Sequence, residues 1–286
     1  MIATNFEFNG IQAKDIDLYI CNINNDFYNG TFTAGSNVTF KTSKATNNYR
    51  NVFHGSIYEE VYTTNFQVIK MKNCNIEAIS AEEKAYYLRL LQRKDGYKYL
   101  RFFEEGYENI YYNAKLSLEW IEFNGLTYGA NISVECDAPF GYSKLQTYDV
   151  TVTKGNTFDL YDDSDELGFV IPELTEIKIN SNGNLVIKNQ LENFYSTNHY
   201  QTEIRNCVAG ETMIINGVNK QITSSSHPTI ANDYNYNPIR ILTLDDNIIR
   251  TTTTTTISNL RKNIFTVTGC NCTIHMAYRT IKKAVI

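Results

Sequence analysis

The strongest constraint on the fold of this chain is a pair of long alternating segments joined by an Asn-Gly dipeptide. Residues 110–123, IYYNAKLSLEWIEF, and 126–136, LTYGANISVEC, place apolar side chains at nearly every second position. Successive side chains of a strand point to opposite faces, so this period of two predicts strands with one buried face. Asn124-Gly125 is typical of a two-residue hairpin turn, in which both residues take positive φ. The centre of the chain is therefore expected to be β-structure.

Composition extends this expectation to most of the chain. Aromatic residues make up 13% of the sequence, with 21 tyrosines, and threonine and isoleucine are frequent. Such side chains fit the pleated, half-buried surface of a sheet. With only four prolines, many turns must be made by Asn and Asp, which tolerate left-handed backbone. Hairpins are predicted at Asn9-Gly10, Asn182-Gly183 and Asn216-Gly217, and the threonine run 251–256 is expected in or beside a strand.

One segment departs from the β pattern and predicts a helix. Ser80-Ala81-Glu82-Glu83 is a capping box, in which the Ser80 hydroxyl accepts from the Glu83 amide and the Glu83 carboxylate reaches back. Arg93 and Lys94 suit the negative C-terminal end of a helix, and Gly96 can close it. Apolar residues follow the box at helical spacing: Ala81, Ala85, Leu88 and Leu91. The helix is predicted over 81–94.

Length and a break near the middle of the chain predict two domains. The chain has 286 residues, which favours two domains over one. At Asp137-Ala138-Pro139 the last alternating segment ends, because Pro139 cannot donate to a strand ladder. The second half shows short strands and turns at regular intervals, which suggest a sandwich or jelly roll. We expect a mainly β protein with one helix, built from two β-sandwich domains at 1–140 and 141–286.

Charge and hydropathy exclude several function classes. The net charge is -5 and no long basic stripe is present, so specific nucleic-acid binding is not expected. No apolar run is long enough to span a bilayer, and the N-terminus lacks the features of a signal peptide. The chain is therefore expected to fold in a cytoplasm. Its six cysteines contain no Cys-x-x-Cys pair and are interpreted as small buried or half-buried hydrophobes.

Candidate catalytic and metal-binding residues are few, and each has a simpler structural interpretation. Cys136 would be a nucleophile only beside a histidine, and none of the four histidines lies in a recognisable motif. A buried cysteine at a strand end is favoured. The acidic segment 159–166 could bind Ca²⁺ but lacks the spacing of an EF-hand, so a solvated loop is favoured. No catalytic residue, cofactor or metal ligand is predicted.

Aromatic residues offer the remaining ligand candidates. Trp120 shares a predicted strand face with Leu118, which indicates a core residue or a sugar-stacking platform. Tyr234 and Tyr236, in the loop 232–238, could contact a ligand or pack on a neighbouring subunit. A carboxylate pair for glycoside hydrolysis also stays open, because its separation is a three-dimensional quantity. A carbohydrate-binding β-sandwich protein and a β-rich glycan hydrolase therefore stay alternatives.

Several segments together resemble the distal tail proteins of long non-contractile phage tails. FEFNGIQAKDIDLYICNINN is similar to the opening strands of that family, and SAEEKAYYLRLLQRKDGYKYLRFF to its helix and following strands. SVECDAPFGYS is similar to the close of its first domain. GETMIINGVNKQI, NPIRILTLDDNII and TIHMAYRTI resemble its final galectin-like sandwich. Gly269-Cys270-Asn271 departs from the glycine-asparagine turn that the family usually shows before its last strand.

The resemblance implies a structural protein and no enzyme. The first domain would form a homohexameric ring that joins the tail tube protein to the tail-tip hub (tail-associated) protein, with an open channel for DNA. The galectin-like jelly-roll domain would be a docking platform for receptor-binding proteins, without sugar binding following from its fold. The protein would be located in the virion, at the tail tip or baseplate, after assembly in the host cytoplasm.

The resemblance also implies an arm or hairpin that clasps the next subunit of the ring. Residues 31–55, TFTAGSNVTFKTSKATNNYRNVFHG, are the candidate, because this polar segment has few large apolar residues with which to bury itself. An arm that completes a neighbour's sheet satisfies edge backbone groups, and repetition closes the ring. The residues assigned to this arm are Ser36, Phe40, Tyr49 and Asn51.

Overall fold

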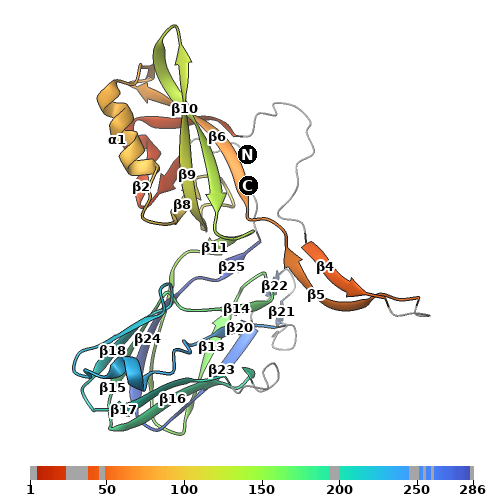
Figure 1. Cartoon of the computed structure of the whole chain (residues 1–286), viewed down its shortest axis with the longest axis vertical. Coiled ribbons are helices and arrows are strands. Elements are labelled where there is room, and N and C mark those ends of the chain that lie inside the picture. Colours follow the sequence, from red (N-terminus) through yellow and green to blue (C-terminus); the bar gives the residue numbers. More distant parts are fainter. Residues whose placement is uncertain are drawn as a thin grey trace. The chain divides into compact units, whose positions relative to one another are not determined.

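The computed structural model describes residues 5–23, 38–44, 49–192, 200–244, 251–253, 256–258 and 261–283. It confirms that the protein is mainly β (Figure 1). The chain divides into two compact units, Met1–Tyr142 with Lys283–Ile286, and Ser143–Lys282. The domain bounds drawn from the sequence, 1–140 and 141–286, stay a prediction. Within the described residues, no helix has the length and apolar character needed to cross a membrane.

The first unit is built on one curved antiparallel sheet, in the order β2–β1–β8–β9–β10–β6–β3. Phe66 on β6 contacts Phe6 on β1 and Phe102 on β8, with ring centroids 5.0 and 5.3 Å apart, so distant strands of the sheet share one core. The strands are β1 (Phe6–Phe8), β2 (Ile11–Gln12), β3 (Leu18–Ile23), β6 (Thr63–Lys72), β8 (Lys98–Phe102), β9 (Ile110–Phe123) and β10 (Leu126–Cys136). Short elements beside them are η1 (Ala13–Ile16), β7 (Asn75–Ile76) and β11 (Gly141–Ser143).

Two Asn-Gly dipeptides of this unit form the predicted hairpin turns. Asn9 and Gly10 have φ of 52° and 79° between β1 and β2, which pair antiparallel. Asn124 and Gly125 have φ of 50° and 74° between β9 and β10, and the pairing extends from Leu126↔Phe123 to the end of β10. The prediction drawn from alternation in this part of the chain is confirmed.

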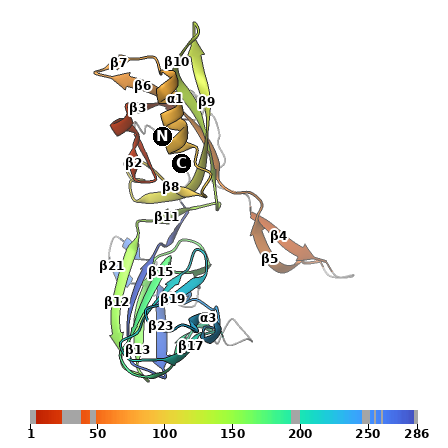
Figure 2. The ribbon, with the colours of Figure 1, turned by 60° about the vertical axis from the view of Figure 1, so that its left-hand side comes forward.

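The predicted helix is present as α1 (Ala81–Leu91), and it packs in the core of the first unit (Figure 2). Its capping box is formed as expected: the Glu83 amide donates to Ser80 Oγ (3.2 Å) and the Ser80 amide donates to Glu83 Oε2 (2.8 Å). The helix ends at Leu91 and not at residue 94. Gln92 leaves the helical conformation, and the Arg93 guanidinium turns to the Asp95 carboxylate at 2.7 Å.

The second unit is a β-sandwich whose two sheets enclose one hydrophobic core. A five-stranded sheet has the order β12–β24–β15–β18–β19, and a four-stranded sheet has the order β13–β23–β16–β17. The first contains β12 (Gln146–Val152), β24 (Cys272–Tyr278), β15 (Leu174–Ile179), β18 (Thr212–Asn216) and β19 (Gln221–Ser224). The second contains β13 (Thr157–Asp162), β23 (Arg261–Thr268), β16 (Gly183–Asn189) and β17 (Thr202–Cys207). Smaller elements are β14 (Gly168–Val170), β20 (Ile241–Thr243), β21 (Thr251–Thr253), β22 (Thr256–Ser258), α3 (Ile230–Asp233) and β25 (Ile281–Lys282).

The hairpin predicted at Asn182-Gly183 is wrong. β15 and β16, on either side of this dipeptide, lie in opposite sheets, so the chain crosses the sandwich here. Gly183 lies against the carbonyl of Gly269, whose own turn joins β23 to β24 and also changes sheets. The sequence pattern does not distinguish these two arrangements. The strands on either side of Asn-Gly each have one buried face, whether they pair in one sheet or lie in opposite sheets of a sandwich.

The hairpin near Asn216-Gly217 is present but has a longer turn. β18 and β19 pair antiparallel with Asn216 opposite Gln221, so four residues form the connection. Gly217 is pressed against the Pro172 carbonyl, where a Cβ atom would clash at 1.9 Å. Of the threonine run, Thr251–Thr253 lie in β21 and Thr256 lies in β22, as expected, and the two strands pair with each other; residues 254 and 255 lie outside the described residues.

The cysteines follow the prediction only in part. Four of them are buried: Cys136, Cys207, Cys270 and Cys272. Cys21 and Cys74 are exposed, which corrects the expectation of buried or half-buried thiols. Cys74 has φ of 62° in the turn between β6 and β7, and Cys21 lies at an irregularity in the pairing of β3 with β6. Neither position faces the core.

Candidate functional site

The candidate arm contains a two-stranded hairpin formed by β4 (Val38–Ser43) and β5 (Val52–Tyr58). These two strands pair with each other and with no other described strand (Figure 1). Of the four residues assigned to the arm, Ser36 lies outside the described residues. Phe40 is on β4 and is 66% exposed, while Tyr49 and Asn51 are exposed in the connection before β5.

The register gathers the hairpin's aromatic residues on one face. Val38 is opposite Tyr58, Phe40 is opposite Ser56, and a bulge then places Thr42 opposite Phe53. Opposed residues share a face, and the Phe40 and Phe53 ring centroids lie 5.4 Å apart in an edge-to-face contact. Phe53 is 59% exposed. We call Val38, Phe40 and Phe53 the hairpin face; Tyr58, at the end of β5, contacts Phe140 of the same chain instead. Sequence reasoning missed Phe53, because only the register shows which side chains share a side.

The hairpin also carries charge of one sign. Between Val38 and Tyr58 the sequence has no Asp or Glu, but it has Lys41, Lys44 and Arg50. All three are exposed. The hairpin therefore presents an aromatic face together with positive charge on a chain whose net charge is negative.

The two tyrosines of the predicted ligand loop have different surroundings. Tyr234 follows α3 and is buried in the core of the second unit, where its backbone bridges to Ile204. Tyr236 is half-exposed, with its ring centroid 5.1 Å from that of Tyr234. Tyr234 is thus a core residue, and a ligand or partner would reach only Tyr236. Trp120 is packed against the core of the first unit, with Lys84 Nζ 5.6 Å from its ring centroid.

Cys136 has the surroundings of a structural residue. Its thiol is fully buried, and burial raises its pKa to about 12. A thiol with so high a pKa is protonated at neutral pH and is a poor nucleophile. The neighbouring Asp137 carboxylate accepts hydrogen bonds from Asn113 Nδ2 (2.7 Å) and from the Tyr142 hydroxyl (3.2 Å).

The acidic segment 159–166 is more ordered than the expected solvated loop. Asp162 is buried and accepts hydrogen bonds from the hydroxyls of Ser164 (2.7 Å) and Thr243 (2.6 Å). Two further carboxylates of the segment face lysines: Asp159 pairs with Lys262 and Asp163 with Lys282. Within the described part of the chain, no group of three or more His, Cys, Asp and Glu residues could hold a metal ion.

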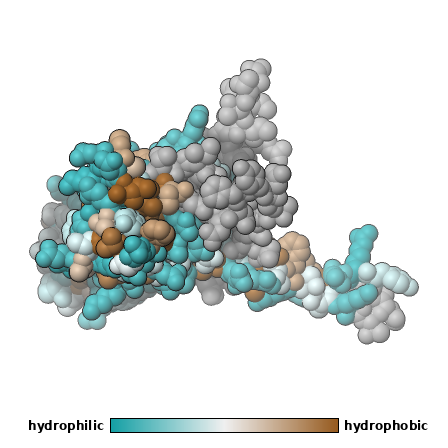
Figure 3. Space-filling model, turned by 90° about the horizontal axis from the view of Figure 1, so that it is seen from above, coloured by the Kyte–Doolittle hydropathy of each residue, from teal (hydrophilic) through white to brown (hydrophobic). Residues whose placement is uncertain are grey.

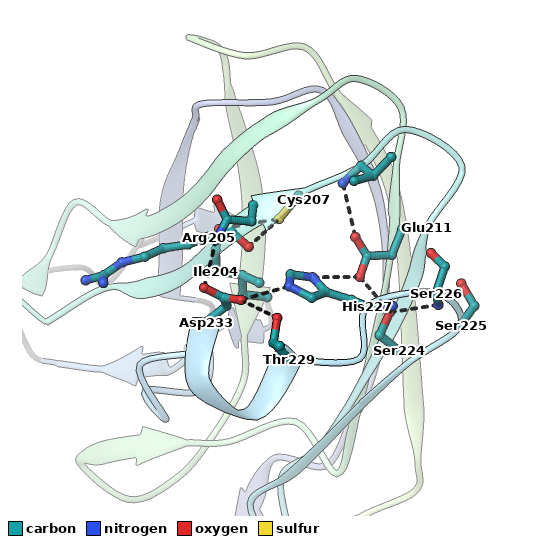
Figure 4. A network of polar contacts seen from close by, with 12 residues as sticks. Ile204, Arg205, Cys207, Glu211, Ser224, Ser225, Ser226, His227, Thr229 and Asp233 are labelled. Carbon is teal, nitrogen blue, oxygen red and sulfur yellow. Dashed lines mark hydrogen bonds and ion pairs between the residues drawn. The ribbon is translucent and has the colours of Figure 1, made fainter.

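A closed polar network surrounds His227 in the second unit (Figure 4). His227 Nδ1 lies 3.1 Å from Glu211 Oε1, and Nε2 lies 2.9 Å from Asp233 Oδ2. The Ser224 hydroxyl donates to Glu211 (2.6 Å) and the Thr229 hydroxyl donates to Asp233 (2.9 Å). The network joins the end of β19 to α3 and to the segment before β18. Since both ring nitrogens are engaged by carboxylates, the arrangement suits a structural tie better than a general base.

Replacing His227 with Gln is expected to destabilise the second unit by about 2 kcal/mol at pH 6, because Glu211 is only 1% exposed and loses a charged neighbour. Burial alone would lower the pKa of His227, but the hydrogen bond with Asp233 and the charge of Glu211 raise it overall. Because the pKa of His227 is higher in the folded protein than in the unfolded chain, the charged histidine stabilises the fold fully below about pH 6.5. This stabilisation is lost as the pH rises through the pKa of the folded protein. Urea unfolding followed by circular dichroism from pH 5.5 to 9.5 measures the difference.

The difference between wild type and His227→Gln should shrink as pH rises, and a difference that grows with pH would contradict this reading of the network. His275→Gln is the matched control. His275 pairs with Asp149 at 2.7 Å, but both side chains are much more exposed than His227. Its loss should therefore cost less than about 0.5 kcal/mol.

A second exposed apolar group lies at the end of the first unit where the β9–β10 and β6–β7 turns are found. Phe123 and Leu126 flank the Asn124-Gly125 turn, and Ile76 is on β7. Figure 3, which looks down on the molecule from above, shows hydrophobic residues gathered among hydrophilic ones. Nothing in the described residues indicates what would cover this group.

Comparisons with known proteins agree along nearly the whole chain. Residues 1–138 match the family model described as the phage tail protein N-terminal domain, and residues 140–278 match the phage tail C-terminal domain. A search of curated protein sequences gives no match.

Three solved structures share the fold at low sequence identity. The Dit protein of phage SPP1, described as a paradigm of the hub adsorption apparatus in phages that infect Gram-positive bacteria, is 10% identical with a TM-score of 0.58; the alignment covers 98% of this chain and 99% of that one. The phage p2 baseplate in its activated conformation with Sr is 7% identical with a TM-score of 0.55, covering 99% of each chain. The phage P2 baseplate with Ca is 9% identical with a TM-score of 0.51, covering 100% of each chain.

Proposed function

Since this chain belongs to the phage tail protein family, we propose that it works as a structural hub of the tail tip. The family and the virion tail location inferred from the sequence resemblance are confirmed, and the fold is that of solved distal tail and baseplate proteins. In the proposed role the first domain forms a homohexameric ring around an open channel for DNA. The chain acts by assembly and carries out no reaction.

The observation that carries the proposal is the hairpin face. Phe40 and Phe53 are more than half exposed on a hairpin that pairs with no other described strand. Large aromatic side chains in such a position favour burial against another surface. If a hairpin docks on a different surface of the next copy, the contact is head-to-tail, and repetition with a closing rotation produces a ring.

The remaining parts of the role are assigned by analogy to the tail-tip hub. The ring would lie between the tail tube protein and the tail-tip hub protein. The β-sandwich of the second unit would be the docking platform for receptor-binding proteins, with half-exposed Tyr236 as one candidate contact. A net charge of -5 suits a conduit through which DNA must slide without sticking.

Multi-angle light scattering and electron microscopy of the purified protein test the proposal, with the double variant Phe40→Ser/Phe53→Ser as the key comparison. The wild type should be a hexamer with six-fold ring images. The variant should be a folded monomer, because both side chains are exposed and contribute little to the fold of a single copy. Rings should therefore disappear while the circular dichroism spectrum of the folded protein stays unchanged.

Phe123→Ser is the matched control, since Phe123 is an exposed aromatic residue outside the hairpin. It should leave the hexamer intact. A wild type that stays monomeric at high concentration would overturn the proposal, and glycan binding by that monomer would favour the carbohydrate-binding alternative. Unchanged hexamers in the hairpin variant would show that another surface closes the ring.

A further inference from the structure

A row of aromatic side chains crosses the first unit on the side away from its core. Each ring contacts the next one in space. The distances between ring centroids are 6.3 Å from Tyr58 to Phe140, 5.9 Å from Phe140 to Tyr142, 6.4 Å from Tyr142 to Tyr99 and 6.3 Å from Tyr99 to Tyr111. All four contacts are edge-to-face, and all five residues are half-buried. We call these five residues the aromatic row.

The row faces outward because its strand residues alternate with core residues. Tyr99 precedes the buried Leu100 on β8, and Tyr111 precedes the buried Tyr112 on β9. Neighbouring side chains of a strand point to opposite faces, so Tyr99 and Tyr111 lie on the outer face of the sheet. The sequence segments YKYL and IYYN contain this alternation, but they do not show that residues 58, 140 and 142 join it.

Acidic residues flank one end of the row. The connection between β8 and β9 carries Glu104, Glu105 and Glu108. It is held beside the row by Arg101, whose Nη1 donates to the Glu108 carbonyl (3.3 Å) and whose guanidinium lies 5.3 Å from the Tyr111 ring centroid. The Arg101 charge is paired with Glu7 at 2.6 Å, and Glu105 is exposed, so this end has a negative character.

The hairpin has the complementary properties. The hairpin face and the aromatic row both consist largely of aromatic side chains, which can pack against each other. The positive charges of the hairpin, Lys41, Lys44 and Arg50, are opposite in sign to the glutamates of residues 104–108. Edge-to-face aromatic contacts stabilise an interface beyond the burial of their area, and complementary charge sets the register of such a contact. A second copy of this chain therefore fits the row better than an uncharged or acidic partner does.

We propose that the aromatic row of one copy receives the hairpin face of the neighbouring copy, with the hairpin's basic residues beside residues 104–108. This inference rests on the proposed ring, and it names the surface that accepts the arm. The interface is heterologous, because the hairpin face and the row are different surfaces, and this is the type of contact that builds a ring.

Cross-linking between copies tests the contact directly. In a Cys21→Ser/Cys74→Ser background, which removes the exposed thiols, the pair Phe40→Cys and Tyr99→Cys is treated with oxidised glutathione. Two thiols lose their protons and electrons to form the disulfide while glutathione disulfide is reduced to glutathione. We expect a ladder of covalent oligomers up to the hexamer on a non-reducing gel. The control pair Phe40→Cys and Phe123→Cys should give monomer only.

A charge exchange provides a second measurement that leaves the aromatic residues unchanged. Lys41 and Glu105 are both exposed, so their reversal should not disturb the fold of one copy. Lys41→Glu and Glu105→Lys should each raise the protein concentration for half-assembly about tenfold, and the double variant should restore it. Light scattering over a dilution series reads this value.

The outcomes separate this inference from the proposed function. If the wild type forms rings and Phe40→Ser/Phe53→Ser abolishes them, but Phe40→Cys/Tyr99→Cys gives no oligomer ladder and the charge exchange gives no restoration, the hairpin docks elsewhere and this inference is overturned. A disulfide found only within monomers would overturn it as well. If the wild type forms no rings, the proposed function fails first.

Discussion

Replacing Gly269 with alanine is expected to unfold the second unit while the first unit stays folded. Gly269 has φ of 90°, and an added Cβ would lie 1.5 Å from the carbonyl oxygen of Asn184. That oxygen belongs to the backbone, so a side-chain rotation cannot relieve the clash. The conformational penalty alone is about 1 kcal/mol, and displacing the backbone where the chain crosses between sheets should bring the total above about 4 kcal/mol. Small domains have total stabilities of about 5–15 kcal/mol.

Two probes distinguish the units in this experiment. Trp120, the single tryptophan, is in the first unit, so its fluorescence reports that unit, while circular dichroism reports both. Urea unfolding of Gly269→Ala should lose the part of the dichroism transition due to the second unit and keep the Trp120 midpoint. Gly155→Ala is the control, because Gly155 has φ of 87° but nothing within 4 Å of an added Cβ. It should cost about 1 kcal/mol. A Trp120 midpoint that falls with Gly269→Ala would show that the two units do not unfold separately.

Replacing Lys70 with alanine is expected to destabilise the first unit by about 2–3 kcal/mol. Lys70 is buried on the inner face of β6, and its Nζ lies 2.7 Å from Glu83 Oε1 and 3.3 Å from the Ala78 carbonyl oxygen. The other oxygen of Glu83 accepts from Ser80 in the capping box. The substitution leaves Glu83 without its cation and opens a space in the core. Removing one partner of a fully buried pair costs about 3–5 kcal/mol, and the cost here is lower because the Glu83 side chain is 37% exposed.

Lys84→Ala is the matched control for Lys70. Lys84 pairs with Glu122 at 3.3 Å on the surface, so its loss should cost less than about 1 kcal/mol. Trp120 fluorescence in urea gives both midpoints. The hydrogen bond from Lys70, followed by that from the Ser80 amide, lowers the pKa of Glu83. Ionised Glu83 therefore stabilises the first unit above about pH 4.3, and this stabilisation is lost as the pH falls through the pKa of the folded protein. An equal effect of the two lysine substitutions would contradict the role assigned to Lys70.

Local backbone chemistry explains the parts of the fold that could be predicted. The alternation around Asn124-Gly125 is realised in β9 and β10, and Ser80 and Glu83 form their capping box. Each depends mainly on interactions between residues that are close in the sequence. The candidate arm was located by resemblance, but Phe53 was missed because a bulge in β4–β5 brings it beside Phe40.

Other features arise only from long-range packing. Asp162, in a segment with the composition of a surface loop, is buried because Thr243, far along the chain, supplies a hydroxyl to it. Lys70 looks like an exposed strand residue in the sequence, but α1 brings Glu83 to its ammonium group. In both cases the residue is buried against a partner that is distant in the sequence, so a local sequence pattern does not predict its burial.

The sequence by itself determined that the chain is mainly β, that β9 and β10 form a hairpin and where α1 begins, because these depend on side-chain period, turn residues and the capping box. The tertiary structure alone decided how strands that are distant in the sequence lie beside one another. It placed β15 and β16 in opposite sheets, and it brought Tyr58, Tyr99 and Tyr142 into one row. The physical reason is that one strand pattern satisfies many pairings equally, and only the packing of the whole core selects among them.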